Sequence, residues 1–370
     1  MNTKSYAIGQ IPDMVPPIAS VGFIGWFRKN LFSSWVNSVL TLFSLWLLYL
    51  TIPPMIDWML VNANFSGTTK QDCTNTGACW PFVSSHIDQF FYGFYPQAER
   101  WRVDITILLL IGLMIPLFIK KFPYKGITAA VALFIYPVVA FFLLVGGSFG
   151  LPVVETSLWG GFSLTLVISV VGIVTSLPIG IVLALGRRSN MPTIRSICTV
   201  FIELWRGVPL ITVLFMSSVM LPLFLPEGVN FDKLLRALIG VSLFAAAYMA
   251  EVVRGGLQAI PKGQFEGAMS LGLSYWKTMS FIILPQALKY VIPSIVSTFI
   301  GLFKDTTLVL IIGLFDFLGI VQTASTDPKW LGMAVEGYVF TALVYGVFCF
   351  AMSQYSQAIE RKLDTGHKKR

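Results

Sequence analysis

The amino-acid sequence predicts an all-α polytopic membrane protein with about eight transmembrane helices, and three observations support this fold class. Of its 370 residues, 55% are hydrophobic and 12% are charged, whereas soluble domains carry about 25% charged residues. The mean hydropathy of the chain is +0.75. Several runs of roughly 20 apolar residues are each long enough to cross a bilayer as a helix.

The first part of the chain, residues 1–150, holds three expected spans at about 35–52, 103–119 and 127–145. The opening residues are polar and contain proline, and they lack the short apolar core and cleavage site of a signal peptide. A long polar and aromatic segment at about 53–102 separates the first two spans. We interpret this part as an N-terminal extension with a periplasmic segment.

The second part, residues 151–370, holds the remaining spans. We expect them at about 159–185, 208–225, 234–253, 294–315 and 334–352. The first of these is longer than a perpendicular crossing needs, so it should tilt. A loop at about 255–290 carries charge, glycine and proline between two apolar runs, and it is the most informative stretch of the chain.

Basic residues predict which side of the membrane each loop occupies. With the amino terminus in the cytoplasm, most of the 26 Lys and Arg residues fall in cytoplasmic segments. The positive-inside rule favours this orientation, which places both termini and the 255–290 loop in the cytoplasm. It also explains the net charge of +8 without a nucleic-acid partner.

The sequence offers little catalytic or metal-binding chemistry. Cys73 and Cys79, in the outer segment, could close a small disulfide loop or remain two free thiols. His86 and His367 are expected on opposite sides of the membrane, so they cannot share a metal ion. The chain contains no G-x-x-x-x-G-K-[ST] phosphate-binding loop and no nucleophile–base motif. We therefore predict neither an enzyme nor a cofactor site in this chain.

The 255–290 loop predicts a short helix–turn–helix at the membrane surface. Phe265, Met269, Leu273 and Trp276 recur at spacings of four, four and three, so they share one helical face. Gly272 is suited to ending the first helix in the left-handed conformation. Such an exposed apolar stripe needs lipid or a protein groove as its partner.

Three further residues are expected to mark helix ends around this loop. Ser274 can cap the amides of the second helix. Pro285 is expected to stop that helix, and Pro293 to stand in the first turn of the next span. The alternative is a plain interfacial helix that joins two spans.

The spacing of these residues resembles the EAA motif of ABC importer permeases, E-A-A-x3-G-x9-I-x-L-P. The matching residues are Glu266, Ala268, Gly272, Ile282, Leu284 and Pro285. Gly267 stands at the second position, where the motif has alanine, so one small residue replaces another. In that family the loop is the coupling helix, which docks in a groove of the cytoplasmic ATPase.

Longer segments resemble the polar amino-acid permeases of the histidine/glutamine type. FIELWRGVPL at 201–210 is similar to the segment that opens a core span, and residues 248–273 and 283–309 are similar to the coupling loop and its flanking helices. The long extension resembles that of the large permease subunit of general L-amino acid importers. This implies a type I ABC importer permease core, residues 151–370, preceded by three extra spans.

The resemblance also implies a function. The chain would be the membrane-spanning permease subunit of an ATP-driven importer that moves L-amino acids into the cytoplasm by alternating access. ATP and Mg²⁺ would be bound by a separate cytoplasmic ABC ATPase dimer. The other implied partners are a second homologous permease subunit, giving a heterodimer, a periplasmic amino-acid-binding protein, and the lipid bilayer of a bacterial inner membrane.

Charged residues at membrane depth are costly, and they are candidates for the substrate pathway. Glu251 and Arg254 are three residues apart and can pair on one helix face. Glu251 could instead meet the ammonium group of a transiting amino acid, although a structural pair is favoured. Lys304 and Asp305 are adjacent, so their side chains point about 100° apart. One could face the pathway and the other the sister subunit, or both could hold helices together.

Two other function classes are alternatives. A secondary transporter coupled to H⁺ or Na⁺ would carry discontinuous helices with buried carboxylates in two related repeats, and the sequence shows no such repeat. A membrane-embedded hydrolase would need a catalytic constellation within the spans, where no histidine lies. ATP-driven uptake in proteoliposomes separates the three classes.

Overall fold

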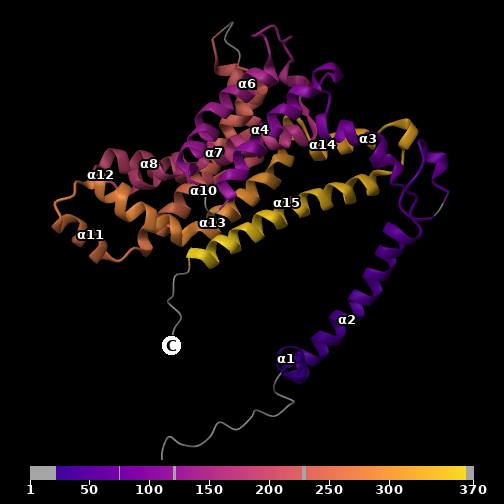
Figure 1. The fold of residues 1–370 in the computed structure, drawn as a ribbon, viewed down its shortest axis with the longest axis horizontal. Helices are drawn as coiled ribbons and strands as arrows, with labels where there is room; N and C mark the ends of the chain where they lie inside the picture. The colour runs from indigo at the N-terminus through magenta and orange to yellow at the C-terminus, as the bar shows by residue number, and fades with distance from the viewer. Residues whose placement is uncertain (1–21, 75, 120–121, 227–230, 364–370) are drawn as a thin grey trace, which may run out of the picture. The chain divides into compact units, whose positions relative to one another are not determined.

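The computed structural model describes residues 22–363 apart from 75, 120–121 and 227–230, and helices dominate it (Figure 1). Both chain ends, which the sequence places in the cytoplasm, lie outside the described residues, as does His367. The chain divides into two compact units, which we describe in turn. They are Met1–Gly67 with Gln71–Trp80, and Thr68–Lys70 with Pro81–Arg370.

The first unit contains an amphipathic helix and one span. α1 (Gly22–Asn30) precedes α2 (Trp35–Ile56), which continues through the π-helical turn Asp57–Val61. Together they form one apolar helix, Trp35–Val61, that is long enough to cross a membrane. The predicted span at 35–52 lies within this helix.

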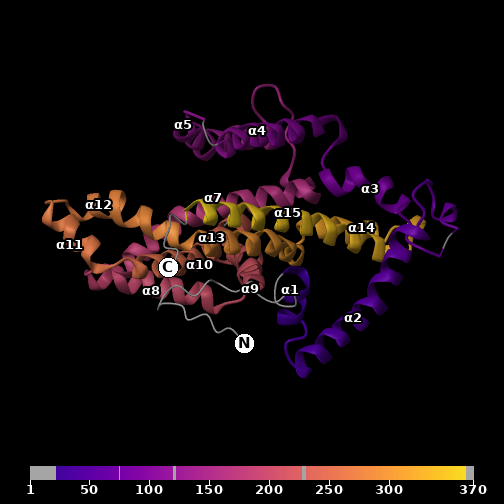
Figure 2. The same ribbon diagram turned by 60° about the horizontal axis from the view of Figure 1, so that its bottom comes forward.

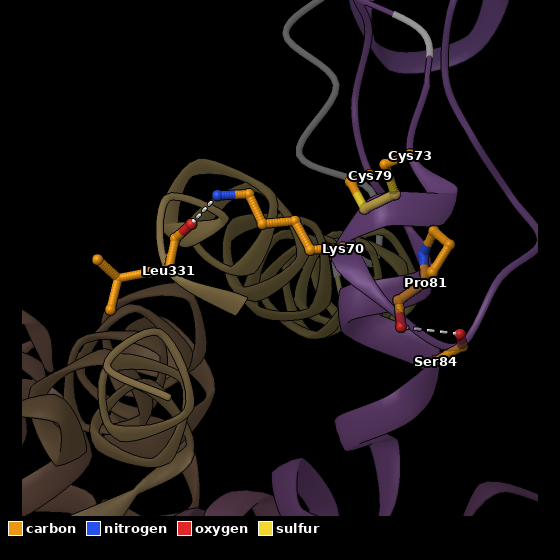
Figure 3. The surroundings of a disulfide bond; sticks show 6 residues. All are labelled: Lys70, Cys73, Cys79, Pro81, Ser84 and Leu331. Atoms are coloured by element: carbon orange, nitrogen blue, oxygen red, sulfur yellow. Dashed lines mark hydrogen bonds between the residues drawn. A yellow bond between two sulfur atoms is a disulfide. The ribbon is translucent and has the colours of Figure 1, made fainter. Parts of the chain in front are cut away.

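A small loop closed by a disulfide follows the span in the first unit (Figure 3). Cys73 and Cys79 are bonded, with their Cα atoms 5.7 Å apart. The Asn64 N–H donates to the Ala78 carbonyl at 2.8 Å, and the Trp80 N–H donates to the Asn64 carbonyl at 3.0 Å. Of the two cysteine states that the sequence leaves open, this structure contains the bonded one.

The rest of the extension consists of short and long helices. They are a 3₁₀ turn at Lys70–Asp72, α3 (Pro81–Tyr92), a 3₁₀ turn at Gln97–Glu99, α4 (Arg100–Phe118), α5 (Lys125–Ala130), a π turn at Val131–Ile135 and α6 (Tyr136–Val145). The continuous runs Gln97–Phe118 and Lys125–Val145 are both long and apolar enough to span a membrane. They correspond to the second and third predicted spans.

A buried arginine attaches this pair of spans to the segment that leads into the core. Arg102 is fully buried, its Nη1 donates to the Pro152 carbonyl at 2.9 Å, and its Nη2 pairs with Glu99 at 2.6 Å. The hydroxyl of Tyr95 donates to the Leu144 carbonyl at 2.8 Å. Removing one partner of a buried charge pair is strongly destabilising. These contacts therefore stabilise the position of the two spans against the segment that leads into the core.

The core is built from the second part of the chain. Its elements are a 3₁₀ turn at Thr156–Leu158, α7 (Gly161–Arg187), α8 (Pro192–Gly207), α9 (Leu210–Phe215), a π turn at Met216–Met220, a 3₁₀ turn at Leu221–Phe224, α10 (Lys233–Ala259), α11 (Lys262–Ser270), α12 (Tyr275–Thr278), a π turn at Met279–Ile283, α13 (Leu284–Asp305), a 3₁₀ turn at Thr306–Ile312, β1 (Phe315–Asp316), α14 (Phe317–Ala324), a 3₁₀ turn at Pro328–Trp330 and α15 (Ala334–Leu363). α7, α10 and α13 pack on one another, and α15 packs on α13 (Figures 1 and 2).

Small residues let α7 and α10 approach closely. A Cβ atom at Gly180 would lie 2.8 Å from the Met249 Cβ and 3.0 Å from the Ala250 nitrogen, so only glycine fits. The hydroxyl of Thr175 donates to the Ser242 hydroxyl across the same interface at 2.9 Å. Close backbone approach and hydroxyl bonds are the usual means by which membrane helices associate.

The described residues contain seven helices that are long and apolar enough to span a membrane, or eight if one bent pair counts as a single span. The bent pair joins Pro192–Gly207 to Leu210–Phe224 at an angle of 103°. The span predicted at 208–225 is the second member of this pair. Pro209 accounts for the break, because proline lacks an N–H group and disfavours helix at the preceding residue.

Two predictions about proline are wrong. Tyr275–Ile312 is one continuous helical run, so Pro285 does not stop the second helix of the loop. Pro293 lies inside α13 rather than in its first turn. The π turn Met279–Ile283 ends directly before α13, and Pro285 is the second residue of that helix, so the helical run continues through the proline. The seventh span therefore starts well before the predicted 294.

The structure packs the end of the extension into the core. Tyr95, Val103 and Leu144 belong to one buried apolar cluster with Leu164 and Ile168 of α7. The compact units accordingly separate near Trp80, whereas the sequence divides the chain near residue 150. The division at 150 stays a prediction about function and not about compact folding units.

Candidate functional site

The turn between α11 and α12 has the geometry of a Schellman motif. Gly272 has φ of +71°, which is the left-handed conformation that the sequence predicts for it. Its N–H donates to the Met269 carbonyl at 2.9 Å, and the Leu273 N–H donates to the Ala268 carbonyl at 3.3 Å. These two bonds satisfy carbonyl groups that the end of α11 would otherwise leave without partners. The left-handed residue is therefore what turns the chain from α11 into α12.

The start of α12 differs from the prediction in one respect. Ser274 does occupy the N-cap position, with φ of −65° and ψ of 159°, but its side chain makes no capping hydrogen bond. α12 is only the first turn of a long helical run, so its stability does not depend on a side-chain cap.

One face of the loop packs against the core. Ala268 is buried, and Phe265, Ile282 and Leu284 pack against a buried apolar cluster that includes Val253 of α10. The guanidinium of Arg188, just after α7, lies 5.9 Å from the centre of the Phe265 ring, within reach of a cation–π contact. These motif residues therefore attach the loop to the helices on either side.

The turn also carries an exposed apolar surface. Its residues, with their exposed fractions, are Met269 at 62%, Leu271 at 77%, Tyr275 at 50% and Trp276 at 67%. Glu266 and Gly267, which open the motif, are exposed beside them. We call these four apolar side chains the outer face of the loop. Apolar surface concentrated on a turn indicates a partner.

The predicted stripe is only half right. Met269 and Trp276 belong to the outer face, but Phe265 and Leu273 are half-buried. Leu271 and Tyr275 were not predicted. Helical spacing fails here because the left-handed residue Gly272 interrupts the helix, so residues before and after it do not share one helical wheel. The signal that could have found the missing two is the run of apolar residues on both sides of that glycine.

Five charged side chains from α7, α8 and α10 meet at the carboxyl end of α7. Glu251 pairs with Arg187 through one carboxylate oxygen and with Arg254 through the other, at 2.7 Å. Arg187 also pairs with Glu203 at 2.8 Å, and Arg206 lies 3.9 Å from Glu251. The Glu251 side chain is only 16% exposed. We call these residues the charge cluster.

The Glu251–Arg254 pair that the spacing predicts is therefore present, and it is part of a larger set. Arg187 lies 64 residues from Glu251 in the sequence and could not be predicted as its partner. The available signal was weak, since Arg187 is simply a basic residue at the end of an apolar run. With both carboxylate oxygens held by arginines, Glu251 joins α7 to α10.

Lys304 and Asp305 lie at the end of α13 in different surroundings. Lys304 is exposed, and it shares one helix face with the exposed residues Ser294 and Ser297. Asp305, one residue on, is half-buried. A lysine on an exposed face of a span is costly in lipid, so this face of α13 suits water or another protein.

The family model for binding-protein-dependent transport system inner membrane components matches residues 176–365. The match covers more than half of the chain and contains both the loop and the charge cluster. The chain belongs to this family. It is therefore an inner-membrane, multi-pass permease subunit and not an enzyme, and the family implies an ATPase and a binding protein as partners.

Similar proteins extend the match beyond this segment. The inner membrane amino-acid ABC transporter permease protein YhdY of Escherichia coli K12 is 58% identical over 341 residues, which cover 92% of this chain and 93% of YhdY. The glutamate/glutamine/aspartate/asparagine transport system permease protein BztC of Rhodobacter capsulatus is 40% identical, over 95% of this chain and 96% of BztC. The glutamate/aspartate import permease protein GltK of Escherichia coli CFT073 is 33% identical, over 55% of this chain and 91% of GltK.

Proposed function

We propose that this permease moves L-amino acids into the cytoplasm by alternating access, driven by ATP hydrolysis on a partner ATPase dimer. The names of YhdY and BztC support amino acids as the substrate class. The observation that carries the proposal is the outer face of the α11–α12 loop, where Met269, Leu271 and Trp276 are each more than half exposed. An apolar turn of this kind is suited to a groove on another protein.

We propose that the loop transmits force because it has two faces. Its outer face docks on the ATPase, and its inner face packs on the core through Phe265, Ile282 and Leu284. A displacement of the loop therefore acts directly on α10 and α13. Glu266, Gly267 and Gly272 complete the docking segment, with Pro285 at the start of α13 where the loop joins the span.

The charge cluster offers a route from the loop to the helix bundle. Arg188 contacts the Phe265 ring, and its neighbour Arg187 pairs with Glu251 and Glu203. A shift of the loop would thus change the contacts that join α7, α8 and α10. Alternating access needs two arrangements of the helices whose balance the ATPase biases. We propose that the charge cluster stabilises one of these arrangements.

We propose that Glu251 and Arg254 act mainly within this cluster. Both carboxylate oxygens of Glu251 already pair with arginines, so an amino-acid ammonium group would compete with them there. Lys304 and Asp305 are the better candidates for the pathway or for the contact with a second permease subunit. Their end of α13 carries a polar exposed face, which supports a heterodimer interface or a water-filled path there.

We also propose that residues 151–370 form the transport core and residues 1–150 an extension, with both termini in the cytoplasm. The family match within 176–365 and the 55% of this chain that GltK covers support a core of this size. The distribution of basic residues supports the orientation.

Reconstitution tests the proposed function. The full complex, with its ATPase and binding protein, is placed in proteoliposomes, and uptake of radiolabelled glutamate, glutamine, aspartate and asparagine is measured. We expect uptake of at least one of them with internal ATP and binding protein, and none with internal ADP. Uptake driven by an H⁺ or Na⁺ gradient without ATP would contradict the proposal and support a secondary transporter.

A further inference from the structure

The first unit contains a groove that the transport function does not use. It lies between α1 and the first turns of α2, with a volume of about 450 Å³. The hydroxyl of Thr41 donates to the Leu31 carbonyl at 2.8 Å, and this bond holds the turn between the two helices. The walls combine apolar side chains of both helices with two amides. They include Phe27, Asn30, Leu31, Asn37, Leu40 and Leu45.

α1 has the composition of a helix that lies in the membrane interface. Phe23 and Trp26 are 78% and 55% exposed, and both of their rings contact Phe27. Arg28 and Lys29 occupy the last turn and are exposed. Aromatic side chains beside basic residues are typical of amphipathic helices at the surface of anionic membranes.

Polarity changes along the groove in the order that a phospholipid requires. Asn30 and Asn37 line the groove where α1 ends and α2 begins, Arg28 and Lys29 directly precede Asn30 in the last turn of α1, and Leu45 lies two turns farther along α2. From residue 37 to residue 45 the helix rises about 12 Å, which is enough for a headgroup region and the first part of an acyl chain. The apolar part of the groove continues along a span that is not buried by the described part of this chain.

From this arrangement we propose that the α1–α2 groove binds one anionic phospholipid. Its phosphate and headgroup would lie at Arg28 and Lys29, near the Asn30 and Asn37 amides, which donate to the Trp26 carbonyl and the Ser33 hydroxyl, and one acyl chain would lie along Leu40 and Leu45. Two adjacent cations favour an anionic headgroup over phosphatidylcholine, whose own ammonium group they repel. The inference does not depend on the proposed amino-acid substrate.

The test uses the full-length permease complex in detergent and titrates phosphatidylglycerol or phosphatidylcholine, with bound lipid counted by native mass spectrometry. We expect the first phosphatidylglycerol to bind about tenfold more tightly than phosphatidylcholine. Arg28→Gln with Lys29→Gln should abolish that preference. The matched control, Lys125→Gln with Arg361→Gln, removes the same charge from other elements and should retain it.

A second variant tests the groove itself. Ser44 lines it, and Ser44→Phe should fill it and lower the binding of both lipids while leaving Arg28 and Lys29 in place. Equal binding of the two lipids to the wild type would overturn the proposal, as would an equal loss of preference in the charge control. Unchanged binding of both lipids by Ser44→Phe would show that a lipid does not occupy the groove.

Discussion

Glu251 joins three arginines, and this makes it the residue on which the charge cluster most depends. Glu251→Gln keeps the size of the side chain but leaves Arg187, Arg206 and Arg254 facing one another without its charge. Because the side chain is 16% exposed, the cost should lie between that of a surface and a buried pair, about 2 kcal/mol. Denaturant unfolding of the purified permease in detergent measures it.

Glu203→Gln is the matched control for that substitution. Glu203 forms an ion pair with Arg187 at 2.8 Å, and its side chain is 55% exposed. Its removal should therefore cost about 0.5 kcal/mol or less. Wild-type stability of Glu251→Gln combined with lost uptake would contradict the structural role and return Glu251 to the substrate pathway.

Local spacing predicted one contact of this cluster and missed the others. Glu251 and Arg254 sit one turn apart on α10, so their pairing follows from helix geometry alone. The contacts of Glu251 with Arg187 and Arg206 require that three helices pack in one particular way, and no short-range pattern encodes that packing. The contact between Arg188 and the Phe265 ring likewise depends on helix packing that no short-range pattern encodes.

Substitutions at two glycines of the loop are expected to have opposite effects. Gly267 lies within α11, and a Cβ atom there would meet nothing within 4 Å. Gly267→Ala should therefore keep uptake and ATPase binding and stabilise the helix by about 0.5–1 kcal/mol.

A Cβ atom at Gly272 would also meet nothing within 4 Å, but Gly272 has φ of +71°, where a β-branched residue is strongly disfavoured. Gly272→Val should disrupt the turn, so the permease loses the ATPase during co-purification and loses uptake.

Gly272→Asn separates backbone strain from side-chain size, because asparagine tolerates the left-handed conformation better than valine does. It should retain part of the ATPase. Full retention by Gly272→Val, with normal uptake, would mean that the turn does not present the docking surface.

At the level of whole elements, apolar composition predicted the helices better than glycine and proline predicted where those helices begin and end. Gly272 ends α11 as expected, because a left-handed glycine makes the Schellman bonds from its own backbone. Pro285 did not end the second helix of the loop, and Pro293 did not stand in the first turn of the next span, because a long membrane helix accommodates proline. The 103° bend before α9 coincides with Pro209, whereas the π turn before α13 has no distinct sequence signal.

For the whole molecule, apolar runs predicted the spans because each must satisfy its backbone inside a bilayer. They could not predict which spans pack together. The packing of α4 and α6 into the core depends on Arg102, whose partners Glu99 and Pro152 lie on either side of the two extra spans. The sequence therefore indicated an extension but not how tightly its second half joins the core.

Orientation across the membrane is the property of the whole chain on which the coupling proposal depends. Labelling with a membrane-impermeant maleimide, in spheroplasts and in inside-out vesicles, measures this orientation. The variant used has Cys198 and Cys349 replaced by serine. Ser270→Cys places a thiol on the exposed end of α11 and should be labelled only in inside-out vesicles. Cys73 and Cys79, joined in the outer segment, should be labelled in spheroplasts only after a reductant is added. The same background without Ser270→Cys is the control. Labelling of Ser270→Cys in intact spheroplasts would put the loop outside, beyond the reach of a cytoplasmic ATPase, and would overturn both the orientation and the coupling role.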